Sequence, residues 1–108
     1  MAAITDKAVE VLEGFLKTLK DANIRIEKAL LFGSYVRGNA GKWSDIDVAI
    51  VSPDFSGIPF YDREMLIPFQ LKTDSRIEVH PFRPEDFTED NGFVKEIIKN
   101  GFELKEIS

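Results

Sequence analysis

The chain has 108 residues, a length that supports one domain with a modest core. It contains no cysteine, which excludes a disulfide framework, a thiolate zinc site and a cysteine nucleophile. No apolar run approaches the roughly 20 residues of a membrane span, and Met1–Lys7 lacks the pattern of a signal peptide. We therefore expect a single domain over residues 1–108 and a soluble, cytoplasmic protein.

The formal net charge is −5. A protein that holds a long nucleic acid duplex is expected to neutralise several phosphates with a basic stripe, and the sequence shows none. Template-directed polymerisation is therefore not expected. An acidic chain can still bind one phosphorylated ligand when cations at its carboxylates reverse the local field, so such binding should depend on metal.

The first half of the chain predicts a helix, a strand, a helical turn and a second strand. Thr5 is a suitable N-cap for a helix to about Ala22, in which apolar residues at helical spacing form a core stripe. Residues 26–32 predict the first strand, Ser34–Asn39 a short helical turn, and residues 45–51 a β-branched second strand. The stripe of the first helix consists of Val9, Leu12, Phe15, Leu16 and Leu19.

The second half predicts two further helices and one or two strands. A helix should run from Pro59 or Phe60 to about Leu71, with Pro68 kinking or interrupting it. Residues 76–82 predict a third strand, which Pro81 confines to a sheet edge or a strand end. A last helix around residues 93–98 should be capped by Gly101, and residues 102–107 could add a short fourth strand. The fold class is α/β (α+β), a mixed sheet of about four strands with helices mainly on one face.

The most informative segment joins a glycine-serine turn to a pair of acids. Gly33 and Ser34 follow the apolar strand ending Leu30-Leu31-Phe32, and Asp45-Ile46-Asp47 opens the next strand. A backbone turn between a strand and a helix is a place where phosphate oxygens bind. Period 2 places Asp45 and Asp47 on one face, about 7 Å apart along the strand. Asp-x-Asp alone would equally fit an exposed strand edge, but the combination indicates a metal-bound triphosphate site.

Residues 33–48 read Gly-Ser-x-x-Arg-Gly, five residues, then Ser-Asp-Ile-Asp-Val. This pattern resembles the signature of the DNA polymerase beta-type nucleotidyltransferase superfamily, and in particular its minimal nucleotidyltransferase (MNT) members. The order of elements matches over most of the chain. The resemblance implies a nucleotidyltransferase-like palm core.

By the same resemblance, Asp45 and Asp47 would ligate two Mg²⁺ ions, with Mn²⁺ as a substitute, while Gly33 and Ser34 would hold the β and γ phosphates of a nucleoside triphosphate. The family also uses a third carboxylate in an apolar-acid-apolar context. Glu78, between Ile77 and Val79, is the segment that fits. Aspartate is the more frequent residue there, so the longer arm of glutamate makes the geometry of one metal an open question.

Four other residues have alternative roles. Arg37 could contact phosphate or pair with an acid such as Asp45, and Lys42 could touch a phosphate or only water. Trp43 could stack on a base or cover the edge of the sheet. His80 shares a face with Glu78 and could ligate a metal, relay a proton or simply be hydrogen-bonded. With one histidine in the chain, a Ser-His-Asp triad is improbable.

The resemblance and these residues together imply transfer of a nucleoside monophosphate, AMP from ATP being the first to test, to an acceptor hydroxyl. The resemblance adds a partner, since small MNT proteins often act beside a helical HEPN protein, as its antitoxin. A homodimer is also possible because nine phenylalanines suggest apolar surface for association. The alternative is a catalytically degenerate module that binds nucleotide or partner without chemistry, which the atypical Glu78 would favour. An antibiotic-modifying transferase would need a substrate domain in addition to these residues.

Overall fold

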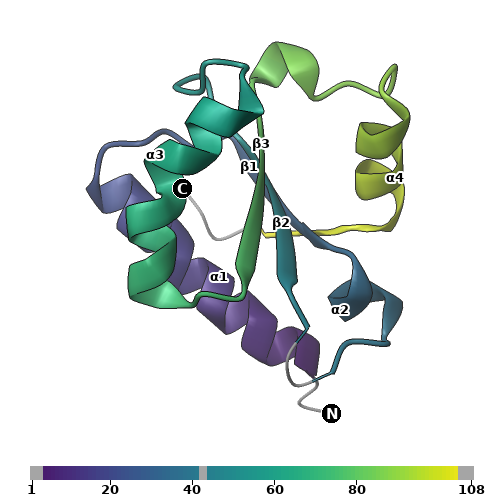
Figure 1. The fold of residues 1–108 in the computed structure, drawn as a ribbon. Coiled ribbons are helices and arrows are strands. Elements are labelled where there is room, and N and C mark those ends of the chain that lie inside the picture. The colour runs from purple at the N-terminus through teal and green to yellow at the C-terminus, as the bar shows by residue number, and fades with distance from the viewer. Residues whose placement is uncertain (1–3, 42–43, 105–108) are drawn as a thin grey trace.

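The computed structural model describes residues 4–41 and 44–104, in which one mixed sheet lies between helices (Figure 1). The strand order is β3-β2-β1-β4; β1 is antiparallel to β2 and to β4, whereas β2 is parallel to β3. This confirms the predicted mixed four-stranded sheet. The elements in chain order are α1 (Ile4–Asp21), β1 (Lys28–Phe32), α2 (Ser34–Arg37), β2 (Ile46–Val51), α3 (Pro59–Thr73), β3 (Ile77–Phe82), the 3-10 turn η1 (Pro84–Asp86), α4 (Gly92–Asn100) and β4 (Phe102–Glu103).

The main core lies on the face of the sheet that α1 and α3 cover (Figure 1). It forms there because alternate residues of β1, β2 and β3 are apolar and point to the same side. The predicted stripe of α1 packs against them, with Val9 partly buried and the other four members fully so. Within the described residues, no helix has the length and apolar character that spanning a bilayer requires. The strand residues of this core are Ala29, Leu31, Ile46, Val48, Ile50, Ile77 and Val79.

The opposite face is covered by α4, which packs through Ile97 onto Leu30 and Ala49 (Figure 1). Asn91 caps this helix, because its side chain accepts hydrogen bonds from the backbone N–H groups of Phe93 at 2.8 Å and Val94 at 3.2 Å. The cover is partial, since α4 spans nine residues and lies over one part of the sheet. Polar residues of β2 and β3 can therefore lie on this face beside the helix.

Two local predictions changed in the structure. Of the two effects predicted for Pro68, a kink or an interruption, the interruption is wrong, because α3 continues through Pro68. Since Pro68 and Glu64 are both exposed, the Glu64 carbonyl that loses its donor can be hydrated. Gly101 does follow α4, but with φ of −77° rather than in the left-handed region. A Cβ there would lie 2.5 Å from the Ile97 carbonyl oxygen and 3.2 Å from that of Leu31, so close backbone packing requires the glycine.

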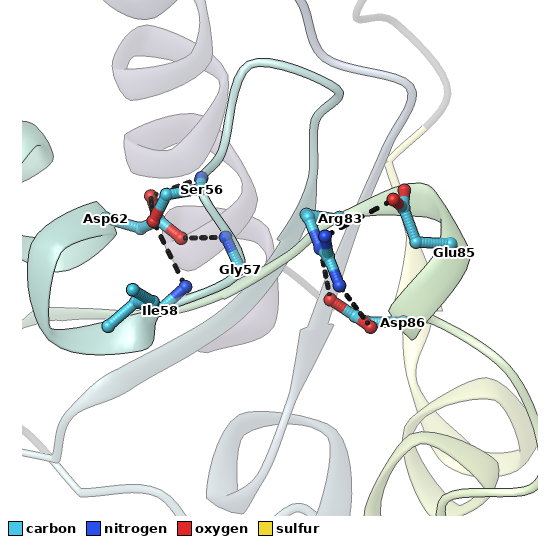
Figure 2. A network of polar contacts seen from close by, with 7 residues as sticks. All are labelled: Ser56, Gly57, Ile58, Asp62, Arg83, Glu85 and Asp86. Carbon is cyan, nitrogen blue, oxygen red and sulfur yellow. Dashed lines mark hydrogen bonds and ion pairs between the residues drawn. The ribbon is translucent and has the colours of Figure 1, made fainter.

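The crossover from β2 to β3 is held by a polar network at the start of α3 (Figure 2). Asp62 is buried, and its carboxylate accepts hydrogen bonds from Ser56 N at 2.8 Å, Ser56 Oγ at 3.0 Å and Gly57 N at 3.1 Å. Gly57 has φ of 91°, and a Cβ on it would lie 2.6 Å from Nε of Arg83. Arg83 is fixed in turn by Asp86, at 2.7 Å. The close packing of Gly57 on Arg83 therefore brings the loop before α3 against the segment that follows β3.

Candidate active site

The parallel pairing of β2 with β3 places Asp47 beside Glu78. Ile46 and Ile77, one residue earlier, point into the main core, so the two acids lie on the face that α4 covers. Glu78 is exposed and Asp47 half-buried. One ligand atom each from Asp47, Glu78 and His80 lies within 4.8 Å of the other two. Two carboxylates and an imidazole are a donor set that suits a divalent cation.

His80 stands on the same face as Glu78, two residues along β3. Its Nε2 is 3.4 Å from Oδ1 of Asp47. The ring packs edge-on against Phe32, with centroids 4.9 Å apart at 63°, and is tilted by 60° to Phe93 at 5.7 Å. The imidazole is therefore held by aromatic packing rather than free in solvent.

Gly33 lies directly against the carboxylate of Asp47. A Cβ on Gly33 would contact Oδ2 of Asp47 and lie 3.2 Å from its Cγ. The residue also has φ of 81° and ψ of −147°, a backbone conformation that is essentially restricted to glycine. The glycine of the turn is thus required by conformation and by the acid packed over it.

The turn continues into α2, a single turn of helix. The carbonyl of Gly33 accepts hydrogen bonds from the N–H groups of Val36 at 3.2 Å and Arg37 at 3.1 Å, and Gly38 ends the turn in the left-handed conformation. Arg37 is exposed, and within the described residues it forms no ion pair with Asp45. The predictions for Lys42 and Trp43 fall outside the described residues.

Asp45 lies one residue before β2, which begins at Ile46 rather than at residue 45. It is exposed and is not in the group formed by Asp47, Glu78 and His80. The strand entry is held by Ile46, whose N–H donates to the Arg76 carbonyl at 2.8 Å. Asp45 is thus at the margin of the site.

Glu78 interacts electrostatically with Asp47 and Asp45. Partial burial raises the pKa of Glu78, and the hydrogen bond to Asp47 and the negative charges of Asp47 and Asp45 raise it further, whereas His80 opposes the shift. Like charges this close favour a bound proton or a bound cation. The arrangement is therefore poised to take up positive charge.

A cavity of about 510 Å³ opens beside Asp47, a volume typical of small-molecule sites. Its inner wall is aromatic, and α4 supplies the far rim, where the Asn100 amide donates to Glu96. Sequence reasoning missed this wall, because it assigned residues 93–98 to a last helix and gave them no part in the site. The sequence carries no signal for this wall, because the exposure of Phe93 beside the buried Val94 is seen only in the structure. The lining residues are Phe32, Gly33, Val36, Arg37, Asp47, His80, Phe93, Glu96, Ile97 and Asn100.

Comparison with known proteins identifies the family. The family model described as "Nucleotidyltransferase domain" matches residues 12–105. A proposed nucleotidyltransferase from Sulfolobus solfataricus is similar in structure, with a TM-score of 0.64, 17% identity, and coverage of 92% of this chain and 80% of that one.

A second solved structure, described as a toxin-antitoxin with AMP-PNP, has a TM-score of 0.60 and 23% identity, with coverage of 86% of this chain and 72% of that one. No curated protein sequence matches the chain. At these identities the two structures support the fold, whereas the family model spans most of the sequence. The turn at Gly33, the acids on β2 and β3 and this match agree, and the chain belongs to the nucleotidyltransferase domain family.

Proposed function

We propose that this nucleotidyltransferase transfers a nucleoside monophosphate from a metal-bound triphosphate, with ATP as the first donor to test, to an acceptor hydroxyl. The observation that carries the proposal is the pairing of Asp47 with Glu78 across β2 and β3, with Gly33 packed against Asp47 and both Gly33 and Asp47 lining the cavity. The acids offer oxygen ligands, and the cavity has room for a nucleotide.

The residues have distinct roles in this scheme. Asp45, Asp47 and Glu78 would hold two Mg²⁺ ions, and Gly33, Ser34 and Arg37 would contact the phosphates. Divalent cations, when bound, polarise the attacking hydroxyl and neutralise charge on the leaving group.

The proposed reaction forms one bond to phosphorus and breaks another. The acceptor oxygen bonds to the α-phosphorus, the bond from that phosphorus to the bridging oxygen breaks, and pyrophosphate leaves. In this scheme Glu78 would also accept the proton of the hydroxyl. No covalent enzyme intermediate is needed, so the protein contributes position and charge.

The acceptor is proposed to belong to a partner protein, in an arrangement where this chain acts as the antitoxin of a helical HEPN-type protein. The similar solved structure described as a toxin-antitoxin with AMP-PNP supports a search in this direction. The outer face of α3 offers a surface for association, since Phe60, Tyr61 and Leu71 are each more than half exposed. Light scattering of the protein alone and after coexpression with its genomic neighbour tests this, and a monomer in both samples contradicts it.

Calorimetry tests the nucleotide site. ATP should bind in Mg²⁺ and fail to bind in EDTA, and the double variant Asp45→Asn/Asp47→Asn should lose binding while circular dichroism shows an intact fold. Asp21→Asn is the matched control, because it removes an exposed carboxylate of α1, on the other side of the sheet. Equal ATP binding in EDTA would refute the metal-dependent scheme.

Glu78→Gln separates catalysis from binding. The variant should lose turnover by orders of magnitude but keep most of its ATP affinity, because triphosphate binding relies mainly on Asp45 and Asp47. An unchanged rate would assign the chemistry elsewhere. If the wild-type protein binds ATP and its partner without any transfer, the degenerate binding module is the better description.

A further inference from the structure

We propose that Nε2 of His80 is a direct ligand, together with Asp47 and Glu78, of one divalent cation, and that it biases this position toward Mn²⁺ or Co²⁺ over Mg²⁺. The inference rests on the proposed metal site and specifies its donor atoms. It differs from an all-carboxylate site because the third member of the cluster is an imidazole.

The separations of the donor atoms fit a shared ion. Ligand atoms bound at about 2.1 Å to one octahedral ion lie about 3 Å apart when adjacent and about 4.2 Å apart when opposite. His80 Nε2 and Asp47 Oδ1 are 3.4 Å apart, so they are already placed as neighbouring ligands. The largest separation in the cluster is within 4.8 Å. The exposed Glu78 side chain can supply the remaining movement by rotation about its torsions.

A competing role for His80 is to orient Asp47 through a hydrogen bond. Such bonds usually span about 2.7–3.2 Å between nitrogen and oxygen. The observed 3.4 Å is longer than this range, although the ring is held firmly and is only 19% exposed. The same two atoms therefore form a long hydrogen bond without a cation and are spaced to bind one between them, and the experiment below separates the two roles.

Aromatic packing also restricts the orientation of the His80 ring. Phe32 and Phe93 contact the imidazole from two elements, β1 and α4, and its neighbour across the sheet on β2 is the small Ala49. This packing limits ring rotation, so little conformational entropy remains to be lost when a ligand binds. A side chain ordered in advance with its nitrogen beside two carboxylates is what a built metal site requires.

The chemical consequence is metal preference. Mg²⁺ takes oxygen ligands and holds its waters strongly, whereas imidazole suits first-row transition metals, whose affinity for nitrogen exceeds that of Mg²⁺. Replacing one oxygen by the His80 nitrogen should therefore raise affinity for Mn²⁺ and Co²⁺ and add little for Mg²⁺.

Electron spin-echo spectroscopy of bound Mn²⁺ tests the proposal without an activity assay. His80 is the sole histidine of the chain, so in protein carrying no histidine tag any imidazole ¹⁴N modulation must come from it. The wild type with Mn²⁺ alone should show this modulation. His80→Asn should abolish it while keeping an N–H that can reach Asp47, and should weaken Mn²⁺ and Co²⁺ binding at least about tenfold, with Mg²⁺ affinity changed less than about threefold.

The outcomes separate the two proposals. Mn²⁺ binding that Asp47→Asn abolishes but that shows no ¹⁴N modulation overturns the ligand role of His80 and leaves the metal site standing. A parallel loss of Mg²⁺ and Mn²⁺ affinity in His80→Asn overturns the metal preference. If wild-type protein binds no Mn²⁺, or Asp47→Asn binds it equally, the metal site itself fails. Circular dichroism of each variant confirms that the fold is retained.

Discussion

Substituting Gly33 by alanine should damage stability and the site together. The backbone of Gly33, at φ of 81° and ψ of −147°, would strain an alanine by about 1–3 kcal/mol. The added methyl would also press on the Asp47 carboxylate, a form of overpacking that costs about 1–3 kcal/mol. The free energy of unfolding should therefore fall by about 2–6 kcal/mol, a large part of the roughly 5–15 kcal/mol of a typical domain.

Urea denaturation monitored by circular dichroism measures this loss of stability. Two controls separate the part due to backbone strain from the part due to the contact with Asp47. Gly38→Ala shares the φ of 81° but meets nothing within 4 Å, so it should cost only about 1–2 kcal/mol of left-handed strain. In an Asp47→Ala background, Gly33→Ala should lose its contact component, and the double-mutant cycle should give about 1–3 kcal/mol of coupling. Metal binding by Gly33→Ala should weaken in parallel, because the methyl displaces the acid. Zero coupling in the cycle would refute the contact argument.

Three further predictions concern stability. Glu78→Gln should raise the melting temperature of metal-free protein at neutral pH, because it removes a like-charge repulsion with Asp47, whose ligand atom lies within 4.8 Å of that of Glu78; in near-aqueous surroundings this repulsion is about 1 kcal/mol. Because the folded-state pKa of Glu78 is raised, its ionised form destabilises the fold above that pKa, so the advantage of the variant should vanish as pH falls through it; a constant advantage would contradict this. Gly14→Ala should stabilise α1 by about 1 kcal/mol, seen as a melting temperature higher by about 4 °C, because nothing lies within 4 Å of the new methyl. Asp62→Asn should cost about 1–3 kcal/mol in urea denaturation, as one carboxylate oxygen that accepts from Ser56 or Gly57 is lost, and an unchanged midpoint would count against the network.

The sequence predicted those parts of the site that depend on local rules. Period 2 assigned Asp47 and Glu78 to the polar sides of their strands, and the glycine-serine turn between a strand and a helix singled out Gly33 as a place for phosphate. Which residues of a strand share one face of the sheet follows from alternation alone. Pro81 was likewise read correctly as an edge signal, because a residue without an N–H is poorly suited to an inner strand.

The other features of the candidate site depend on how segments far apart in the sequence pack together. Nothing in the alternation of β3 states that Glu78 pairs with Asp47 rather than with a residue two positions away, since register is set by the crossover through α3. The capture of His80 between Phe32 and Phe93 requires α4 to cross that face of the sheet. Helical periodicity predicts which residues of α4 are buried, but it does not predict which face of the sheet they pack against. Pro68 was misjudged for a similar reason, because exposure decides whether its missing hydrogen bond can be tolerated.

The placement of Asp47 and Glu78 on two parallel strands also bears on folding. The acids become neighbours only after the chain from Val48 to Ile77, including all of α3, has docked across the sheet. Such non-local contacts carry a high contact order and tend to form slowly. The unfolded chain cannot present this pair, so a ligand that bridges them binds the folded state alone and stabilises it by mass action, by about 2.7 kcal/mol at one hundred times its dissociation constant. Binding of the nucleotide and its cation would then stabilise the docked position of the β2–β3 crossover. Protection of the α3 amides from hydrogen exchange should therefore rise with the concentration of nucleotide and cation.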